Sequence, residues 1–275
     1  MAKQCSNKTD KPLEGTQLRS VTFRHSNTLY SQQQDIIAEE AAIAISYNGQ
    51  SHAVMMASPV DLEDFAIGFS TTERIIDTPE DLITIQARKA KQGYTLNLQI
   101  RKELMQRLAG KQRITSGKSS CGVCGISDLA EALPSLDSFK SSPTPDHSII
   151  EKAVRTLHAN QALQQQSGAT HAAGLYRRAS GEQLLIREDI GRHNALDKLI
   201  GALTTQPSIK KSDCFILMSS RASHELISKS VIAGINTLVT ISAATSLAIE
   251  LAEKTNLNLI GFVRGKRQII YAQSC

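Results

Sequence analysis

The apolar residues of the first hundred positions follow two different periods. Residues 43–47 and 52–56 alternate between apolar and polar side chains, and Asn48-Gly49 separates the two segments. Asn-Gly between alternating segments is a strong signal for a β-hairpin. Residues 62–69 then carry apolar side chains at the i, i+3, i+4 and i+7 positions of a helix, and Ser58 is expected to cap that helix. The pattern therefore predicts a hairpin followed by a buried helix.

Changes in composition divide the chain into four parts. Residues 1–18 are polar and charged, which predicts a disordered tail. A further alternating strand over 94–100 completes an α+β N-terminal domain, to which we assign residues 19–114. Residues 115–146 are rich in Ser, Gly, Thr and Pro and are expected to form a mobile loop and linker. The remainder, 147–275, is a separate domain.

Strands and helices alternate through that second domain. A helix is expected from about Ile150, followed by a hairpin that turns at Ser180-Gly181. The elements predicted after it are strand 213–219, helix 222–233, strand 237–242, helix 245–254, strand 257–263 and strand 267–272. Strands separated by helices of this length predict βαβ crossovers. We therefore expect an α/β fold with a mixed, partly parallel sheet.

Three polar clusters follow strands of this predicted sheet. They are Glu188 to His193, Ser219-Ser220-Arg221, and Arg264-Gly265-Lys266-Arg267. Open α/β sheets bind ligands at the carboxyl ends of their strands, close to helix N-termini. A single charged loop at such a position is about as often merely solvated as it is part of a binding site. Three such loops at equivalent ends of one sheet favour a site for an anionic ligand.

Composition limits the class of protein. The chain has 275 residues, a net charge of +5 and 4% aromatic residues, without a motif that reads nucleic acid, so nucleic acid is not expected as a partner. No apolar run approaches the roughly 20 residues that span a bilayer, so no membrane association is expected. The N-terminus lacks the apolar core of a signal peptide. We therefore expect a cytoplasmic protein whose cysteines are reduced at rest.

The candidate chemistry lies in Cys121-Gly122-Val123-Cys124-Gly125. Six basic residues and one acidic residue precede this pair over 101–118. Positive charge lowers the pKa of a thiol, and only the thiolate is nucleophilic. A structural zinc site would need two further ligands at suitable spacing, and His171 and His193 do not supply that spacing. No bound metal is therefore expected.

A thioredoxin-like role and a purely structural role both fit the cysteine pair poorly. A thioredoxin-like dithiol is expected at the start of a helix, whereas this pair lies in a Ser/Gly-rich loop. A structural pair has little hydrophobic role in such a loop. Thr170-His171-Ala172-Ala173 is similar to the His-containing strand of zinc deaminases, but the His-x-Glu element is missing. The residues alone predict a reactive thiol in redox chemistry or sulfur transfer, and leave both open.

Several motifs together resemble the FdhD/NarQ family of sulfur carrier proteins for formate dehydrogenase. They occur in the family's order at 61–69, 121–125, 170–173, 188–198 and 219–223. The resemblance implies that a cysteine desulfurase passes persulfide sulfur to Cys121, with Cys124 assisting. It also implies delivery to the molybdenum (or tungsten) bis(molybdopterin guanine dinucleotide) cofactor of formate dehydrogenase. The implied fold is a cytidine-deaminase-like α/β domain with a smaller N-terminal domain, working as a homodimer.

The resemblance also assigns the cofactor-contacting segment. It comprises Phe262, Val263, Arg264, Gly265, Lys266 and Arg267. We expect Arg221, Arg264 and Arg267 to hold the pyrophosphates and guanine ends of the cofactor. Asp189 is a candidate acceptor for guanine or ribose, and His193 is a candidate proton shuttle. The alternatives are a cofactor-binding chaperone without sulfur transfer and a dithiol redox protein.

Overall fold

The computed structural model describes residues 11–108, 136–265 and 267–275. Its largest sheet has six strands in the order β12-β11-β10-β9-β7-β8. Their bounds are β7 His171–Arg177, β8 Gln183–Asp189, β9 Cys214–Met218, β10 Thr237–Thr240, β11 Asn258–Arg264 and β12 Arg267–Ala272. β10 pairs in parallel with both β9 and β11, whereas β7 and β12 run antiparallel to their neighbours. The predicted α/β class with a mixed sheet is confirmed.

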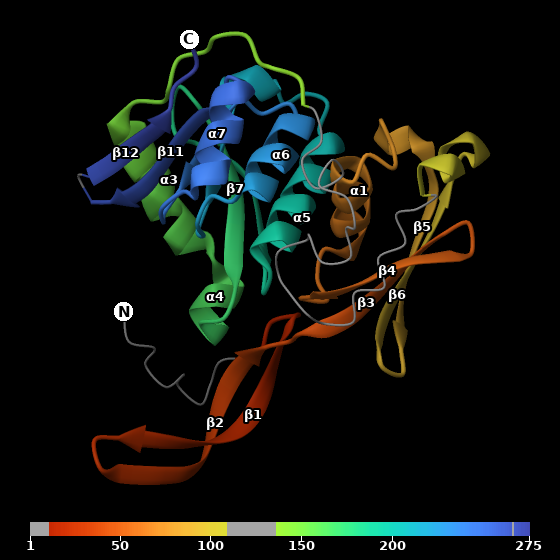
Figure 1. The fold of residues 1–275 in the computed structure, drawn as a ribbon. Helices are drawn as coiled ribbons and strands as arrows, with labels where there is room; N and C mark the ends of the chain where they lie inside the picture. The colour runs from red at the N-terminus through yellow and green to blue at the C-terminus, as the bar shows by residue number, and fades with distance from the viewer. Residues whose placement is uncertain (1–10, 109–135, 266) are drawn as a thin grey trace.

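Helices cover both faces of this sheet (Figure 1). They are α3 His147–Asn160, α4 Ala162–Ser167, α5 Arg192–Thr204, α6 His224–Ile232 and α7 Ser246–Lys254, with a short 3-10 turn at Lys211–Asp213. Ile216 and Met218 of β9 pack in the cluster that holds α5, α6 and α7, and Phe215 and Leu217 pack with α3 on the other side. Successive residues of a strand face opposite sides. This burial on both faces accounts for the continuous apolar run of β9.

The N-terminal part builds a second sheet of four strands in the order β4-β3-β6-β5. Its elements are β3 Ala41–Tyr47, β4 Gln50–Ala57, β5 Leu82–Ala90 and β6 Gly93–Ile100, with α1 Leu62–Thr72 and 3-10 turns at Pro79–Asp81 and Lys102–Leu108. The hairpin predicted around Asn48-Gly49 is confirmed. Phe65 and Phe69 of α1 pack against this sheet. The helix starts later than the Ser58 cap predicts, because Ser58 is hydrogen-bonded instead to the end of β8 and the residue after it.

Helix α1 also packs against α5 and so joins the two parts of the molecule (Figure 1). Glycines allow the backbones to approach closely. A Cβ atom at Gly68 would lie 1.7 Å from the carbonyl oxygen of Asp197, and one at Gly201 would lie 1.9 Å from that of Asp64. Neither position has room for a side chain. The contact is therefore a close helix–helix interface in which a glycine from each helix is required.

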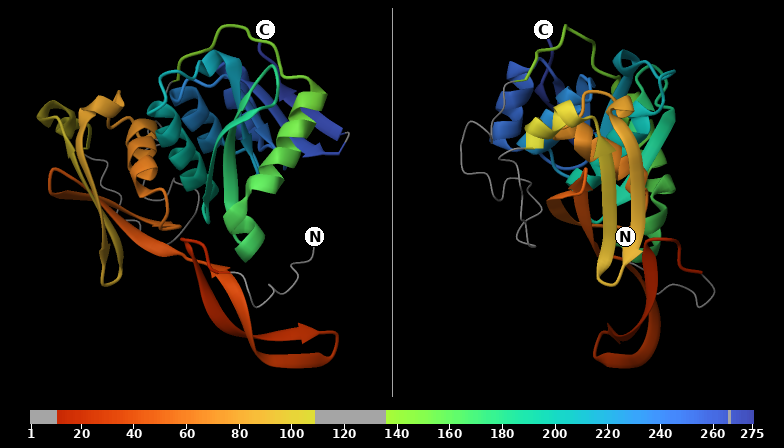
Figure 2. Two further views of the ribbon diagram at one scale, coloured as in Figure 1. Left: turned by 180° about the vertical axis from the view of Figure 1, so that it is seen from behind. Right: turned by 90° about the vertical axis from the view of Figure 1, so that its right-hand side faces the viewer.

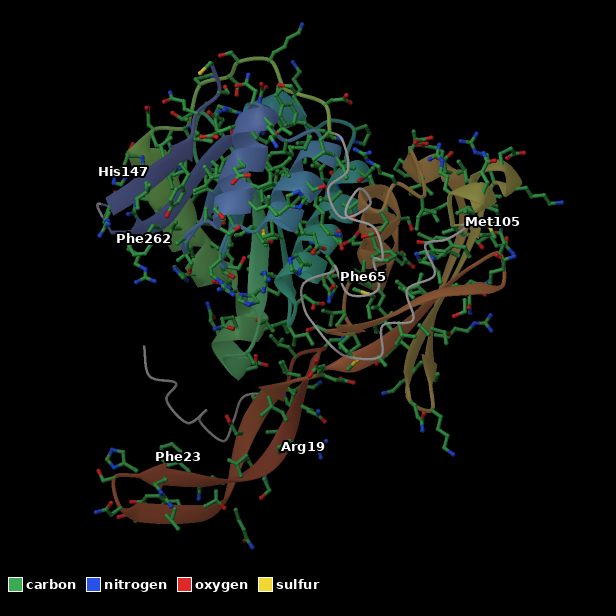
Figure 3. The ribbon with its side chains drawn as sticks, viewed as in Figure 1. Arg19, Phe23, Phe65, Met105, His147 and Phe262 are labelled. Atoms are coloured by element: carbon green, nitrogen blue, oxygen red, sulfur yellow. The ribbon has the colours of Figure 1, made fainter. Side chains whose placement is uncertain are left out.

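A two-stranded ribbon, β1 Thr16–His25 and β2 Thr28–Ala38, projects from the body (Figures 1 and 2). Arg19 and Phe23 lie along it (Figure 3). Residues 1–10 of the predicted disordered tail lie outside the described residues. Residues 16–18 belong to β1, which corrects the predicted tail of 1–18. Their pairing with 36–38 stabilises a polar segment that the local pattern does not identify as a strand.

No helix among the described residues is both long and apolar enough to cross a lipid bilayer.

Candidate functional site at the carboxyl edge of the sheet

The carboxyl ends of four strands meet along one edge of the six-stranded sheet. β8, β9, β10 and β11 all run in the same direction, because β7 is antiparallel to both β8 and β9. The segments that follow β8, β9 and β11 are the three polar clusters identified in the sequence. His171, the first residue of β7, is the register partner of Asp189 and lies at the same edge. The topology therefore brings the predicted clusters to one edge.

Three helices begin at this edge and point their N-termini toward it. Helix α5 begins after Gly191, α6 after Ser223 and α7 after Thr245. The first N–H groups of a helix have no partner within the helix, and its dipole places partial positive charge there. Phosphates and other anions bind at such termini. Three N-termini beside exposed arginines form an edge suited to an anionic ligand.

The β11–β12 hairpin contributes two arginines that share one aromatic ring. The guanidinium carbons of Arg264 and Arg267 lie 4.8 and 4.9 Å from the centre of the Phe262 ring. The two arginines are direct register partners. Like charges at directly opposed positions destabilise a strand pair, whereas cation–π contacts compensate in part. The hairpin therefore holds two exposed positive charges together, an arrangement that an anion would stabilise.

The remaining residues of the predicted cofactor segment differ in their surroundings. A Cβ at Gly261, the residue before Phe262, would lie 2.8 Å from Thr240 Oγ1, so the backbone passes close to β10 there. Val263 is buried in the core beneath α3, which corrects its assignment as a cofactor contact. Gly265 forms the exposed turn with φ of 54°. Lys266 lies outside the described residues.

Asp189 is a buried residue that holds the backbone around the site in place. Its carboxylate is fully buried, lies 2.7 Å from Lys198 Nζ, and accepts hydrogen bonds from the N–H groups of Ser58 and Gly191 and from Asn194 Nδ2. The Ser58 backbone oxygen in turn accepts from Lys198. Because the carboxylate is inaccessible, the expected contact with guanine or ribose is wrong. Asp189 instead fixes the turn that starts α5 and ties it to the N-terminal part.

His193 is largely buried at the start of α5 and connects α5 to α6. Its Nε2 lies 3.4 Å from Ser223 Oγ and 3.4 Å from Glu225 Oε2. Glu225 Oε1 lies 3.8 Å from Lys229 Nζ, one turn further along α6. Glu225 was not among the residues predicted from the sequence. The sequence feature that could have identified Glu225 is its position two residues after the helix cap Ser223, at the same edge of the sheet as His193.

His171 also lies at this edge, although it was not among the residues predicted to contact the cofactor. Its Nδ1 lies 3.5 Å from Ser219 Oγ. Partial burial lowers the pKa of His171, and the positive charges of Arg192 and Arg221 lower it further, whereas Asp189 opposes them. Arg221 itself is exposed. The edge therefore combines exposed guanidinium groups with a histidine that favours its neutral form.

The predicted cysteine pair, Cys121 and Cys124, lies outside the described residues. Three of the six basic residues expected to activate it are described, namely Arg101, Lys102 and Arg107, and the two arginines pair with carboxylates. Arg101 forms an ion pair with buried Asp81, and Arg107 makes a bidentate contact with Asp77 at 2.9 and 2.8 Å. Each of these two arginines therefore already has a carboxylate partner within the N-terminal part. Because the cysteines lie outside the described residues, the lowering of the thiol pKa by the basic stretch stays a prediction.

Across 11–108, 136–265 and 267–275, the structure contains no group of three or more His, Cys, Asp or Glu side chains that could hold a metal ion.

Comparison with known proteins assigns the chain to a family. The model of the FdhD/NarQ family matches residues 38–275. A sulfur carrier protein FdhD from Bordetella petrii is 43% identical over 241 residues, which cover 87% of this chain and 86% of the relative. The protein of the same name from Variovorax paradoxus is 40% identical over 266 residues, covering 96% and 95%.

A solved structure shares the fold. The crystal structure of a formate dehydrogenase accessory protein from Desulfotalea psychrophila superposes with a TM-score of 0.70 at 20% identity, and covers 94% of this chain and 96% of that one. The family model spans the four-stranded sheet, the six-stranded sheet and the whole carboxyl edge. The motifs singled out in the sequence all lie within that match. This chain is a member of the FdhD/NarQ family.

Proposed function

We propose that this protein is a sulfur carrier in the maturation of a formate dehydrogenase. The observation that carries this proposal is the match to relatives named sulfur carrier protein FdhD, at about two identical residues in five over most of both chains. The sequence also contains the reactive thiol pair that such a role needs, at Cys121 and Cys124. The partners proposed with this role are a cysteine desulfurase as donor, the formate dehydrogenase, and a second copy of the chain.

We further propose that the carboxyl edge of the sheet binds the client, molybdenum (or tungsten) bis(molybdopterin guanine dinucleotide). The guanine dinucleotide ends carry pyrophosphates, which suit helix N-termini and guanidinium groups. The edge offers the N-termini of α5, α6 and α7 together with Arg221, Arg264 and Arg267. Arginine forms planar, bidentate contacts to phosphate. These features support an anionic, phosphate-rich client at this edge.

The proposed loading step is an exchange between sulfur atoms. The Cys121 thiolate attacks the outer sulfur of the donor's cysteine persulfide, the donor's S–S bond breaks, and the donor leaves as a thiolate. Cys121 then carries the persulfide, whose proton came with the transferred sulfur. The exchange involves no net oxidation or reduction of the two proteins. Cys124, three positions away, is proposed to assist as a second acceptor or as a resolving thiol.

Mass spectrometry of the intact protein tests the loading step. After incubation with a cysteine desulfurase and cysteine, the protein should gain the mass of one sulfur atom, and Cys121→Ala should lose that gain. Cys275→Ala is the matched control, because Cys275 is the exposed free thiol of the described residues and should leave loading unchanged. Loading of Cys121→Ala equal to that of wild type would overturn the assignment.

Titration with guanosine diphosphate tests the proposed client edge, since this nucleotide reproduces the guanosine and pyrophosphate of the client. Arg267→Ala should weaken binding about tenfold, as expected when one charge-assisted hydrogen bond is lost. Arg88→Ala is the control, because Arg88 is also exposed but lies on β5 of the four-stranded sheet. A cofactor chaperone without sulfur transfer would bind the nucleotide through Arg267 but would show no sulfur gain on Cys121.

A further inference from the structure

His171 occupies a central place on the carboxyl edge that the proposed function does not yet use. It begins β7, which lies between β8 and β9 in the sheet. Its register partner is Asp189 on β8, and its imidazole approaches Ser219, the residue that follows β9. The imidazole is half-buried. His171 therefore stands between the cluster that follows β8 and the cluster that follows β9.

Hydrogen bonds around Ser219 suit the His171 tautomer that carries its proton on Nε2. The Ser219 hydroxyl oxygen accepts the N–H of Ala172 at 2.9 Å, and the N–H of Ser219 donates to the Ala172 carbonyl at 3.0 Å. The Ser219 hydroxyl thus has its own proton still to donate. His171 Nδ1, at 3.5 Å, is an acceptor for it. In a neutral imidazole whose Nδ1 accepts, Nε2 carries the hydrogen and is a donor.

The charges that face His171 favour this neutral form. Arg192 at the start of α5 and Arg221 after β9 are positive, whereas Asp189 on β8 is negative and already paired with Lys198. Burial and the two arginines together lower the pKa of His171. The imidazole therefore favours its uncharged form, in which it can donate one hydrogen bond.

We propose that His171 is a ligand-contacting residue whose Nε2–H donates a hydrogen bond to an anionic oxygen of a bound pyrophosphate. The inference rests on the proposed function, because it names a further contact within the same anion-binding edge. An uncharged donor adds a directed hydrogen bond without adding a third positive charge to those of Arg192 and Arg221. The histidine thereby selects for an oxygen acceptor at one place on a site whose other contacts are mainly electrostatic.

Two replacements separate a ligand contact from a merely structural role. The amide nitrogen of glutamine reaches the place of Nε2, whereas that of asparagine reaches only the place of Nδ1. His171→Gln should therefore bind guanosine diphosphate within about threefold of wild type, and His171→Asn should bind about tenfold more weakly. If asparagine preserves binding and glutamine does not, the imidazole only positions Ser219 and the proposal is wrong. Circular dichroism verifies that both variants fold.

A pH profile provides a readout that a structural role would not change. The ratio of wild-type to His171→Gln affinity cancels the titration of the phosphate itself. That ratio should be constant from pH 8 to about 6.5, and should rise at lower pH as His171 becomes a cation beside the bound anion. A flat ratio down to pH 5 would overturn the proposal. If the wild-type protein itself fails to bind the nucleotide, the proposed client edge fails, and the inference fails with it.

Discussion

Replacement of Asp197 by asparagine should strongly destabilise the packing of α5 against α1 and α6, because it removes a charge from a buried cluster. Lys229 Nζ lies 2.8 and 2.9 Å from the two Asp197 oxygens and 2.9 Å from Thr72 Oγ1, which in turn donates to Asp197 at 2.7 Å. Burial lowers the pKa of Lys229, but the surrounding carboxylates outweigh this effect and raise it. Lys229 is therefore charged, and it depends on Asp197 for its closest compensation.

The expected magnitude follows from this geometry. At 2.8 Å and an effective dielectric constant of about 20, the attraction between Lys229 and Asp197 is roughly 6 kcal/mol. Part of that attraction only offsets the desolvation of the carboxylate, which asparagine does not suffer. Glu73 and Glu225 remain at 3.9 and 3.8 Å from Lys229 and compensate in part. We therefore expect a loss of about 3–5 kcal/mol, typical when one partner of a buried pair is removed.

Urea unfolding followed by circular dichroism measures the effect. Asp77→Asn is the matched control, since Asp77 also makes a two-point contact with a cation but is 65% exposed, and should cost at most about 1 kcal/mol. The double variant Asp197→Leu/Lys229→Met should be more stable than Asp197→Asn, because no unpaired charge stays buried. Equal losses at Asp197 and Asp77, or a double variant no better than the single one, would refute the reasoning.

Three further predictions concern folding. Gly201→Ala should cost at least about 1–3 kcal/mol in urea unfolding, because its Cβ meets the Asp64 carbonyl, and an unchanged midpoint would contradict the close helix contact. Ser58→Ala should cost about 1–3 kcal/mol in the same assay by leaving the Ile190 N–H without its hydroxyl acceptor, whereas a loss below about 0.5 kcal/mol would argue against that bond. Burial lowers the pKa of His171 and His224, so below a pH of about 6.5 the unfolded chain binds more protons than the folded protein. The free energy of unfolding should therefore fall as the pH decreases below that value. His171→Gln should reduce this pH dependence, and a steeper dependence in that variant would contradict the reasoning.

The elements that can be predicted are those with a strong local pattern. β9, β10 and β11 are short apolar runs separated by helices, and β12 begins and ends as the alternation predicts. The pattern does not predict the ribbon of β1 and β2, because it is mostly polar and depends on cross-strand pairing. Nor does it predict helix α4, which has six residues. The first N–H groups of α4, at Leu163 and Gln164, donate to the distant Glu188 carboxylate, which no local pattern reveals.

The candidate site also contains features that the local pattern predicts and features that it does not. The sequence predicts that Arg221, Arg264 and Arg267 share an edge, because parallel strands place the residues that follow them on one side. The prediction for Asp189 is wrong, because a carboxylate in a polar loop has the same local pattern whether it faces solvent or is buried on a lysine. Lys198 lies nine residues after Asp189 on the following helix, and only the packing of α5 against the N-terminal part buries both.

By itself the sequence determined the alternation of strands and helices, the edge where the polar clusters gather, and the family to which the thiol pair belongs. These depend on local periodicity and on residue types at fixed spacing, both of which are present in the unfolded chain. Tertiary structure alone decided which charged groups are buried and paired and which are exposed. Arg101, Arg107 and Asp189 are paired, whereas Arg264 and Arg267 remain exposed. The reason is that burial and ion pairing depend on distances between residues far apart in the chain.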